Sequence, residues 1–348
     1  MKKPNTPFHT LSFEIIGLAI LLGIITGILP NVVSADSHPG AWKYEWSETD
    51  FSRHDISYSD IMSGGPPKDG IPPIDHPEFI SVQEALNNDQ AFGSNKLGDN
   101  EPVVGLIVDG VAKAYPLRIL TWHEIVNDEI AGIPVTITFC PLCNSSIVFD
   151  RRLDGRILDF GTTGKLRNSD LIMYDRQTQS WWQQFIGQAI VGRLTGSSLK
   201  TIPSRLESWE NFRNRAPDGQ VLVPNETSMR NYGRNPYVGY DSASSPFLYS
   251  GEMPENINPM SRVVAIKNQA WSLDLLRKKT SINQDDLIIS WRSGQNSALD
   301  SGTISKGKDV GNVLVQRKNS NGQLIDVTHD ITFAFVFHAF RPDGVIHQ

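Results

Sequence analysis

The sequence predicts a strand-rich α+β protein with short helices, and three observations support that fold class. Short apolar and β-branched runs recur along the chain, and two Asp-Gly pairs stand between such runs. Apolar residues at helical spacing cover only short segments. The two kinds of segment do not alternate regularly, so a doubly wound parallel sheet is not expected.

The first predicted elements form a hairpin followed by a helix. Val103–Val108 and Val111–Tyr115 flank Asp109-Gly110, a pair that favours a tight two-residue turn between antiparallel strands. Leu117–Val126 carries apolar residues at helical spacing. A strand–turn–strand–helix unit is therefore expected here.

Two further strands are predicted on either side of the cysteines. Val135–Phe139 runs into them and Ile147–Phe149 leaves them, and Asp154-Gly155 predicts a second hairpin. Towards the C-terminus a helix is expected at Ala270–Arg277. The last strands are predicted at Leu287–Trp291, Val313–Gln316 and Ile331–Phe340.

Two segments resemble each other internally. Val103–Phe139 and Val263–Trp291 both read as strand, turn, a segment with small and aromatic residues, helix, acidic turn and strand. A degenerate duplication would give two similar lobes, at residues 67–200 and 255–348. The second segment has no counterpart of the cysteines or of His123, so any chemistry is expected in the first lobe.

The N-terminus reads as an export signal. Lys2 and Lys3 precede the apolar run Ile15–Leu29, and Val33–Ala35 places small residues at a cleavage position. Residues 1–35 are therefore predicted to be a signal peptide or a retained signal anchor. This predicts an extracytoplasmic protein, secreted or tethered, whose membrane contact is limited to this segment.

The remaining chain divides into a polar, aromatic arm or linker at residues 36–66 and a main domain at residues 67–348. Without residues 1–35 it holds 30 basic and 37 acidic residues, a net charge of −7. A mildly acidic protein is not expected to bind nucleic acid, which requires clustered Lys and Arg.

Cys140 and Cys143 are the only cysteines in the 348 residues. Two thiols at this spacing can share a metal ion or form a disulfide. In thioredoxin-like proteins a helix follows the first cysteine, whereas here Asn144 and a β-branched run follow. Strand, Cys-Pro-Leu-Cys, a residue tolerant of positive φ, and strand is the layout of a metal-binding knuckle. A structural pair without function also remains open.

A single knuckle needs further ligands, and His123 is the best placed histidine. It lies in the predicted helix that leads to the cysteine strand, whereas His338 is a weaker candidate near the C-terminus. A Cys2His set suits zinc or copper. If the pair is instead a redox dithiol, Cys140 is the expected attacking thiol.

A second polar cluster follows the cysteines. Phe160–Asp170 is rich in Gly and contains Lys165, but it lacks the order of a nucleotide-binding P-loop. Ser169 and Ser180 lack a nucleophile elbow, so hydrolase chemistry is not indicated. The residues expected to line a pocket are Glu124, Asn168, Asp170, Tyr174, Asp175 and Trp181.

From Gly64 to near the C-terminus the chain resembles the domain-of-unknown-function family 3179 (DUF3179). The segments that carry the resemblance are Gly64–Phe79, Ala114–Asp128, Thr138–Arg151 and Phe160–Gly192. The resemblance implies a prokaryotic protein, commonly exported, with one long domain and no assigned activity. The signature residues it implies are His123, Cys140, Cys143, Asn168, Asp170, Tyr174 and Asp175.

One position departs from the family pattern. The resemblance implies a His directly after the Phe of the last aromatic strand, whereas Arg341 follows Phe340 here and the histidine comes earlier, at His338. This weakens His338 as a metal ligand.

Three functions remain as hypotheses. The leading one is an extracytoplasmic metal-binding protein that uses Cys140, Cys143 and His123 to hold copper or zinc, with a partner protein at the membrane surface. The second is a thiol–disulfide oxidoreductase that uses the same cysteines. The third is a non-catalytic module that binds a small ligand.

Overall fold

Tight hairpins build most of the fold, as the Asp-Gly pairs predict. Asp109 and Gly110 have φ values of 48° and 82° and join β3 (Pro102–Val108) to β4 (Val111–Pro116). Positive φ at both central residues is what a type I′ turn requires, and Asp and Gly tolerate it. The prediction of these two strands is confirmed.

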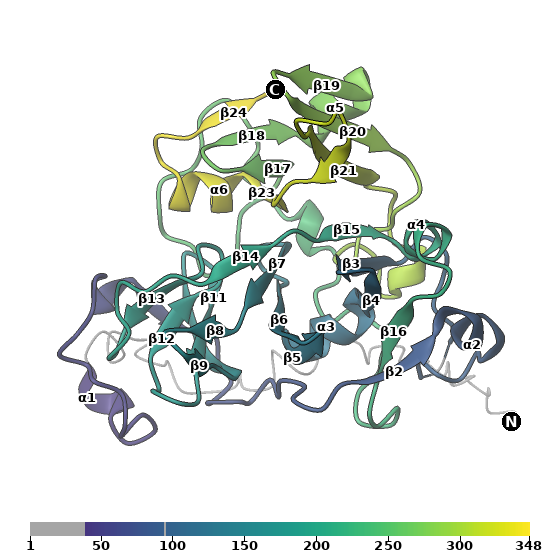
Figure 1. Ribbon diagram of the computed structural model, residues 1–348. Coiled ribbons are helices and arrows are strands. Elements are labelled where there is room, and N and C mark those ends of the chain that lie inside the picture. The colour runs from purple at the N-terminus through teal and green to yellow at the C-terminus, as the bar shows by residue number, and fades with distance from the viewer. Residues whose placement is uncertain (1–38, 94) are drawn as a thin grey trace, which may run out of the picture. The chain divides into compact units, whose positions relative to one another are not determined.

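The computed structural model describes residues 39–93 and 95–348, so the predicted export signal lies outside the described residues. Five sheets of four or five strands form a five-bladed, propeller-like arrangement (Figure 1). Within the described ranges, no helix is long and apolar enough to cross a membrane.

The first three sheets come mainly from the first two thirds of the chain. Sheet I consists of β1 (Ile61–Ser63), β10 (Phe160–Arg167), β11 (Asp170–Asp175), β12 (Trp181–Gln183) and β13 (Gln188–Val191). Sheet II consists of β14 (Lys200–Ile202), β7 (Ser145–Asp150), β6 (Ile133–Cys140) and β5 (Ile125–Ile130). Sheet III consists of β15 (Arg205–Ser208), β3, β4, β16 (Gln220–Val223) and β2 (Glu78–Ser81).

The last two sheets come from the C-terminal third, coloured green to yellow in Figure 1. Sheet IV consists of β23 (Asp330–Phe333), β17 (Arg262–Ile266), β18 (Gln269–Ser272) and β24 (Val345–His347). Sheet V consists of β19 (Ser281–Gln284), β20 (Leu287–Arg292), β21 (Asn312–Lys318) and β22 (Leu324–Asp326). A separate two-stranded ribbon pairs β8 (Arg152–Leu153) with β9 (Arg156–Ile157).

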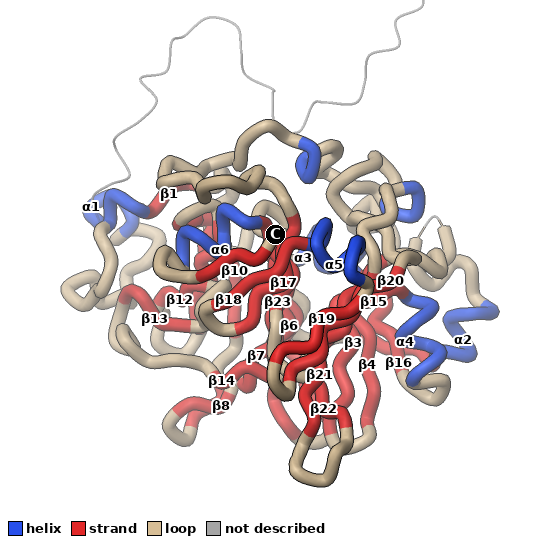
Figure 2. Tube along the Cα trace, turned by 90° about the horizontal axis from the view of Figure 1, so that it is seen from above, coloured by secondary structure: helices blue, strands red, loops and turns tan. Residues whose placement is uncertain are grey.

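The helices are short, and each from α2 onwards lies between two strands in chain order (Figure 2). They are α1 (Pro39–Trp42), α2 (Val82–Asn87), α3 (Leu117–His123), α4 (Trp209–Arg215), α5 (Leu273–Lys279) and α6 (Ala334–Phe340). Single 3₁₀ turns occur at η1 (Tyr58–Asp60), η2 (Tyr240–Ser242) and η3 (Ile304–Lys306).

The predicted α+β class is wrong. Strands make up 39% of the structure and helices only 15%, so the helices form no layer of their own. The two lobes expected at residues 67–200 and 255–348 are also wrong, because the two compared segments each contribute to two sheets of the five. The physical reason is that α3 leads from sheet III to sheet II, and α5 from sheet IV to sheet V, instead of returning to the starting sheet.

Three element boundaries also differ from the predictions. The expected strand at Ile331–Phe340 divides into β23 and α6, because a continuous apolar run suits a buried helix as well as a strand. The helix expected at Ala270–Arg277 begins later, at Leu273, because the preceding residues belong to β18. The side chain of Ser272 caps its first turn by accepting a hydrogen bond from the N–H of Leu275. The helix expected at Leu117–Val126 ends at His123.

The hairpin of β6 and β7 lies between the two largest apolar clusters. Ile137 and Val148 belong to one cluster, whereas Ile147, Phe149 and both cysteines belong to the other. Because side chains alternate between the faces of a strand, burial on both faces requires the nearly continuous apolar sequence seen here. The cysteines therefore sit at the end of a rigid, fully enclosed hairpin.

Residues 39–66 pack against sheet I. Trp42, Trp46 and Phe51 are buried around the Trp181 ring of β12, with ring centroids 5.2, 5.1 and 5.4 Å from it. Aromatic rings at such distances contribute a large apolar contact area. This segment is therefore part of the core around sheet I.

Candidate functional site

The turn that carries the cysteines joins β6 to β7. The last paired residues are Cys140 and Ser145, and the N–H of Cys143 donates to the Cys140 carbonyl at 3.2 Å. Asn144 has φ of 50°, as expected for the residue after the second cysteine. The predicted strand–turn–strand layout is confirmed, and neither thiol lies at a helix N-terminus.

A strand from the C-terminal end of the chain fixes this turn. The carbonyl of Cys143 accepts hydrogen bonds from Thr332 Oγ1 at 2.8 Å and from the Phe333 N–H at 3.2 Å. Asn144 Nδ2 donates to the Ile331 carbonyl at 2.8 Å. Three bonds to β23 therefore hold the backbone of the turn in one position.

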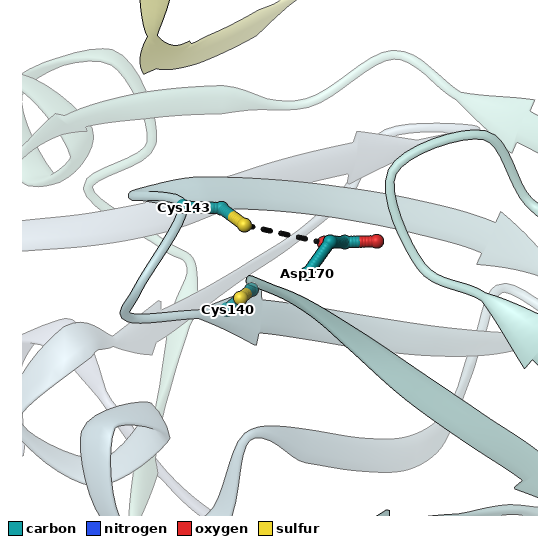
Figure 3. Close-up of side chains that lie close together, drawn as sticks. All are labelled: Cys140, Cys143 and Asp170. Carbon is teal, nitrogen blue, oxygen red and sulfur yellow. Dashed lines mark hydrogen bonds between the residues drawn. The ribbon is translucent and has the colours of Figure 1, made fainter. Parts of the chain in front are cut away.

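Asp170 faces the two thiols (Figure 3). It begins β11 directly after a turn in which Asn168 and Ser169 both have positive φ. Cys143 Sγ lies 3.5 Å from Asp170 Oδ1, and Cys140 Sγ lies 3.6 Å from the Ser169 carbonyl. The two sulfurs and one carboxylate oxygen lie within 4.8 Å of one another, and all three residues are buried.

The Asp170 carboxylate is oriented by fixed donors on one side only. Its Oδ2 accepts hydrogen bonds from Gln183 Nε2 at 2.7 Å and from the Phe185 N–H at 2.9 Å. Its Oδ1 is left facing the thiols. Outer hydrogen bonds that hold one oxygen towards a shared point are typical of metal-ligating carboxylates. The donor set of two sulfurs and an oxygen fits a metal ion.

The surroundings of these groups are strongly acidic. Burial raises the pKa of Asp170 to about 7. Burial and the nearby charge of Asp170 raise the pKa of Glu124 to about 8 and that of Asp330 to about 7. In the described part of the chain, none of these three carboxyls forms an ion pair with a basic side chain. A bound cation would favour the charged forms of these carboxyls.

The thiols respond to the same environment. Burial raises the pKa of Cys140, and the negative charges of Asp170 and Glu124 raise it further. Burial, followed by Cys140 and Asp170, raises the pKa of Cys143 well above its ordinary value. Without a cation, both sulfurs are therefore thiols at neutral pH, and neither is an activated nucleophile.

These shifts predict how stability depends on pH. An acid whose pKa is higher in the folded than in the unfolded chain binds more protons when folded, so stability falls as pH rises between the two values. Glu124, Asp170 and Asp330 place this window between about pH 4 and about pH 8.

We expect the metal-free protein to lose several degrees in Tm between pH 6 and pH 8, measured by thermal unfolding in a chelator. Carboxyls with lowered pKa values, such as Asp241 and Asp326, are already charged throughout that range and cannot produce the loss. A Tm that stays level or rises over this range would contradict the assigned burial of the three acids.

His123, expected as the third ligand, is not part of this group of ligand atoms. Its Nδ1 lies 2.7 Å from the Pro72 carbonyl and its Nε2 lies 2.8 Å from the Tyr232 hydroxyl. Burial lowers its pKa, so the ring is neutral at neutral pH. Because both of its nitrogens are hydrogen bonded, His123 links α3 to Pro72 and Tyr232. The residue that faces the cysteines in place of His123 is Asp170.

Three of the other expected pocket residues, Tyr174, Asp175 and Trp181, lie at or beside the opposite end of β11. Asp175 comes five residues after Asp170 in the strand, which separates the two by roughly 16 Å, because each residue adds about 3.3 Å. Tyr174 donates to Asp69 Oδ2 at 2.6 Å, and Asp175 accepts from Trp182 Nε1 at 2.9 Å. Trp181 is enclosed in the aromatic core described above.

Other expected residues have different surroundings. Asn168 lies in the turn before Asp170, where its positive φ helps reverse the chain. His338 lies in α6 and is not part of the group of ligand atoms.

Two residues near the cysteines had no signal in the sequence. Asp330 Oδ1 accepts from the Ser146 N–H at 2.9 Å, whereas its buried Oδ2 has no hydrogen-bond partner among the described residues. Gln183 orients Asp170 through the bond given above. Both are distant from the cysteines along the chain, and the packing of sheets I and IV against sheet II brings them close.

The comparisons with known proteins give one match. No curated protein and no solved structure gives a significant match to the chain. The model of the family described as "Protein of unknown function (DUF3179)" matches residues 68–344. This match includes both cysteines, Asp170 and the strand that fixes their turn, and it covers most of the chain, so the protein belongs to the DUF3179 family.

Proposed function

We propose that this protein binds a single metal ion, zinc or copper, through Cys140, Cys143 and Asp170. The observation that carries the proposal is the convergence of two thiols and one oriented carboxylate oxygen in a buried, acidic site. Thiolate sulfur suits both zinc and copper, and a carboxylate oxygen is an accepted zinc ligand. The ion would displace the thiol protons and compensate the buried negative charge.

We propose that this binding takes place on the extracytoplasmic side of a membrane. The basic start, the apolar run Ile15–Leu29 and the small residues at Val33–Ala35 support export. A partner protein at the membrane surface, which gives or receives the ion, fits this location. The acidic net charge of the chain supports a partner other than nucleic acid.

The same geometry gives little support to the alternatives. An attacking thiol needs a lowered pKa and access to its substrate, whereas burial raises the pKa of Cys140. A small-ligand pocket lined by Trp181 gains no support, because other aromatic rings enclose that side chain. Metal binding is therefore the function that the site supports best.

The test is the metal content of the chain, measured by mass spectrometry after purification without chelator and after addition of Zn2+ or Cu+. We expect about one ion per wild-type chain. The Cys140→Ser, Cys143→Ser double variant should lose the ion, with an affinity at least about 100-fold lower, because both sulfur ligands are removed.

A matched control keeps the result specific. Ser63→Ala alters an exposed residue of β1, away from the site, and should bind like the wild type. If the reduced wild type takes up neither zinc nor copper while its circular dichroism shows a folded protein, the proposal is wrong.

A further inference from the structure

Cys140, Cys143 and Asp170 are closed off from solvent (Figure 3), with exposed fractions of 2%, 0% and 0%. Strands make most of the wall around them, because β6, β7, β11 and β23 all pair with neighbouring strands. Opening the wall at any of these strands would break a ladder of backbone hydrogen bonds. Access to the thiols is therefore expected where the wall is held in another way.

One part of this wall comes from the long connection between η2 and β17. Tyr240 Oη donates to the carbonyl of Leu142, a residue between the two cysteines, at 3.1 Å. The same oxygen accepts a hydrogen bond from the Phe247 N–H at 3.3 Å. The Phe247 carbonyl accepts from Ser169 Oγ, and the Ser169 carbonyl lies 3.6 Å from Cys140 Sγ. The connection is therefore bonded both to the cysteine turn and to the turn before β11.

Residues 244–257 of this connection are weakly attached. Among the residues that the structure describes, no backbone–backbone hydrogen bond joins them to one another or to the rest of the chain. Within the same ranges, the two bonds at Phe247 are their only hydrogen bonds to other parts of the chain, and Tyr249 adds ring packing on Phe335 with centroids 5.0 Å apart. Segments with so few backbone hydrogen bonds open locally at a low free energy.

The backbone next to Phe247 is strained. Leu248 has φ of 51°, in the left-handed region, where a bulky side chain is unfavourable. Phe247 itself is 50% exposed, so its side chain gains little from burial in this position. The two hydrogen bonds at Phe247 must therefore offset the strain at Leu248 for the segment to stay in place.

We propose that residues 244–257 form a lid over the cysteine–aspartate group, and that the Tyr240 hydroxyl keeps this lid closed. Opening the lid exposes the thiols and admits the ion, while the ligand side chains and β23 stay in place. The role of the lid in ion entry rests on the proposed function, whereas its role in access to the thiols does not.

The test measures how fast the thiols react in the reduced, metal-free protein. Cys140 and Cys143 are the only cysteines in the chain, so iodoacetamide labelling followed by mass spectrometry reports on this site alone. A buried group reacts in proportion to the population of the open state. Tyr240→Phe keeps the ring and removes both hydroxyl bonds, so labelling should become roughly 3- to 10-fold faster.

Two control variants make the result specific. Tyr249→Phe also removes a tyrosine hydroxyl, but the bond of that hydroxyl, to the Glu252 carbonyl at 2.6 Å, lies within the lid. Asp175→Asn weakens hydrogen bonds at the far end of β11 and so lowers the stability of the whole protein. Labelling through a local opening does not depend on global stability, so neither variant should change the rate more than about twofold.

Metal exchange gives a second readout. The rates of Zn2+ uptake, and of Zn2+ release to excess chelator, are measured by stopped flow. Tyr240→Phe should raise both rates by the same factor and leave the affinity within about twofold of the wild type, because the lid supplies no ligand and opens equally with and without the ion. A disturbed ligand set would lower the affinity instead.

The outcomes separate the lid from the metal site. An unchanged labelling rate in Tyr240→Phe would overturn the lid, and so would an equal acceleration in Tyr249→Phe or Asp175→Asn. If labelling follows the expectation and the wild type binds neither zinc nor copper, the lid stands and the proposed function fails. If Tyr240→Phe lowers Zn2+ affinity as much as it speeds release, the hydroxyl supports the ligands and does not hold a lid.

Discussion

Replacing Arg118 by Met is expected to lower the free energy of unfolding by about 3–5 kcal/mol, because it leaves a buried carboxylate without its counter-charge. Arg118 Nε donates to Glu101 Oε2 at 2.9 Å, and its Nη2 donates to Glu101 Oε1. Both side chains are 1% exposed. Arg118 also donates to the carbonyls of Asn95 and Lys96, so the same change frees the loop before β3.

Arg317→Met is the matched control. Arg317 Nε lies 2.9 Å from Asp286 Oδ2, and the two side chains are 40% and 52% exposed. Water screens such a pair, and its loss should cost no more than about 1 kcal/mol. Urea unfolding of both variants gives the comparison, and equal losses would show that the Arg118–Glu101 pair is hydrated in solution.

The second large effect is expected from two aspartates at opposite ends of β11. Asp170→Asn should lower metal affinity at least about 100-fold, because it removes a ligand charge whose position Gln183 and Phe185 fix. Without metal, its stability at pH 8 should equal or exceed that of the wild type. The reason is that burial raises the pKa of Asp170 to about 7, so the wild type must hold this buried charge at pH 8.

Asp175→Asn should show the opposite pattern. Asp175 accepts hydrogen bonds from the Thr178 N–H at 2.6 Å, from Thr178 Oγ1 at 2.9 Å and from Trp182 Nε1 at 2.9 Å. Losing part of this set should cost about 1.5–3 kcal/mol of stability. Metal affinity should stay unchanged. Calorimetric titration and thermal unfolding of both variants test the pair, and a shared loss of metal affinity would contradict the separation of the two ends.

The sequence predicts local structure well where the backbone preferences of a few neighbouring residues determine it. Asp109-Gly110 specifies a turn because both residues tolerate positive φ, and Asn144 does the same after the cysteines. The strands on both sides of the cysteines follow from their β-branched residues. These features need no knowledge of the rest of the chain.

The arrangement of the sheets could not be predicted in this way. The helical spacing at Leu117–His123 does not say whether the next strand returns to the same sheet or starts another, and it starts another. The apolar run Ala334–Phe340 suits strand and helix alike, because its surroundings are apolar on every side. The fold class followed from these connections, and it was therefore predicted wrongly.

Only part of the candidate site could be predicted, because its residues come from different sheets whose arrangement the sequence does not specify. Cys140 and Cys143 are recognisable from their spacing, and Asp170 stood among the expected polar residues. His123 was favoured over Asp170 because it lies closer to the cysteine strand in the expected order of elements. The packing of sheet I against sheet II brings Asp170 to the thiols, and Asp330 of sheet IV accepts a hydrogen bond from Ser146 near the second cysteine.

The bonds from the cysteine turn to β23 have a consequence for the order in which the protein matures. Cys143 and Thr332 are 189 positions apart, so the turn acquires its fixed shape only after almost the entire chain has been delivered. A nascent chain that still lacks β23 contains both thiols but not the frame that holds them. We therefore expect the ion to enter late, as a final step of maturation, and to stay out of chains that end before residue 330.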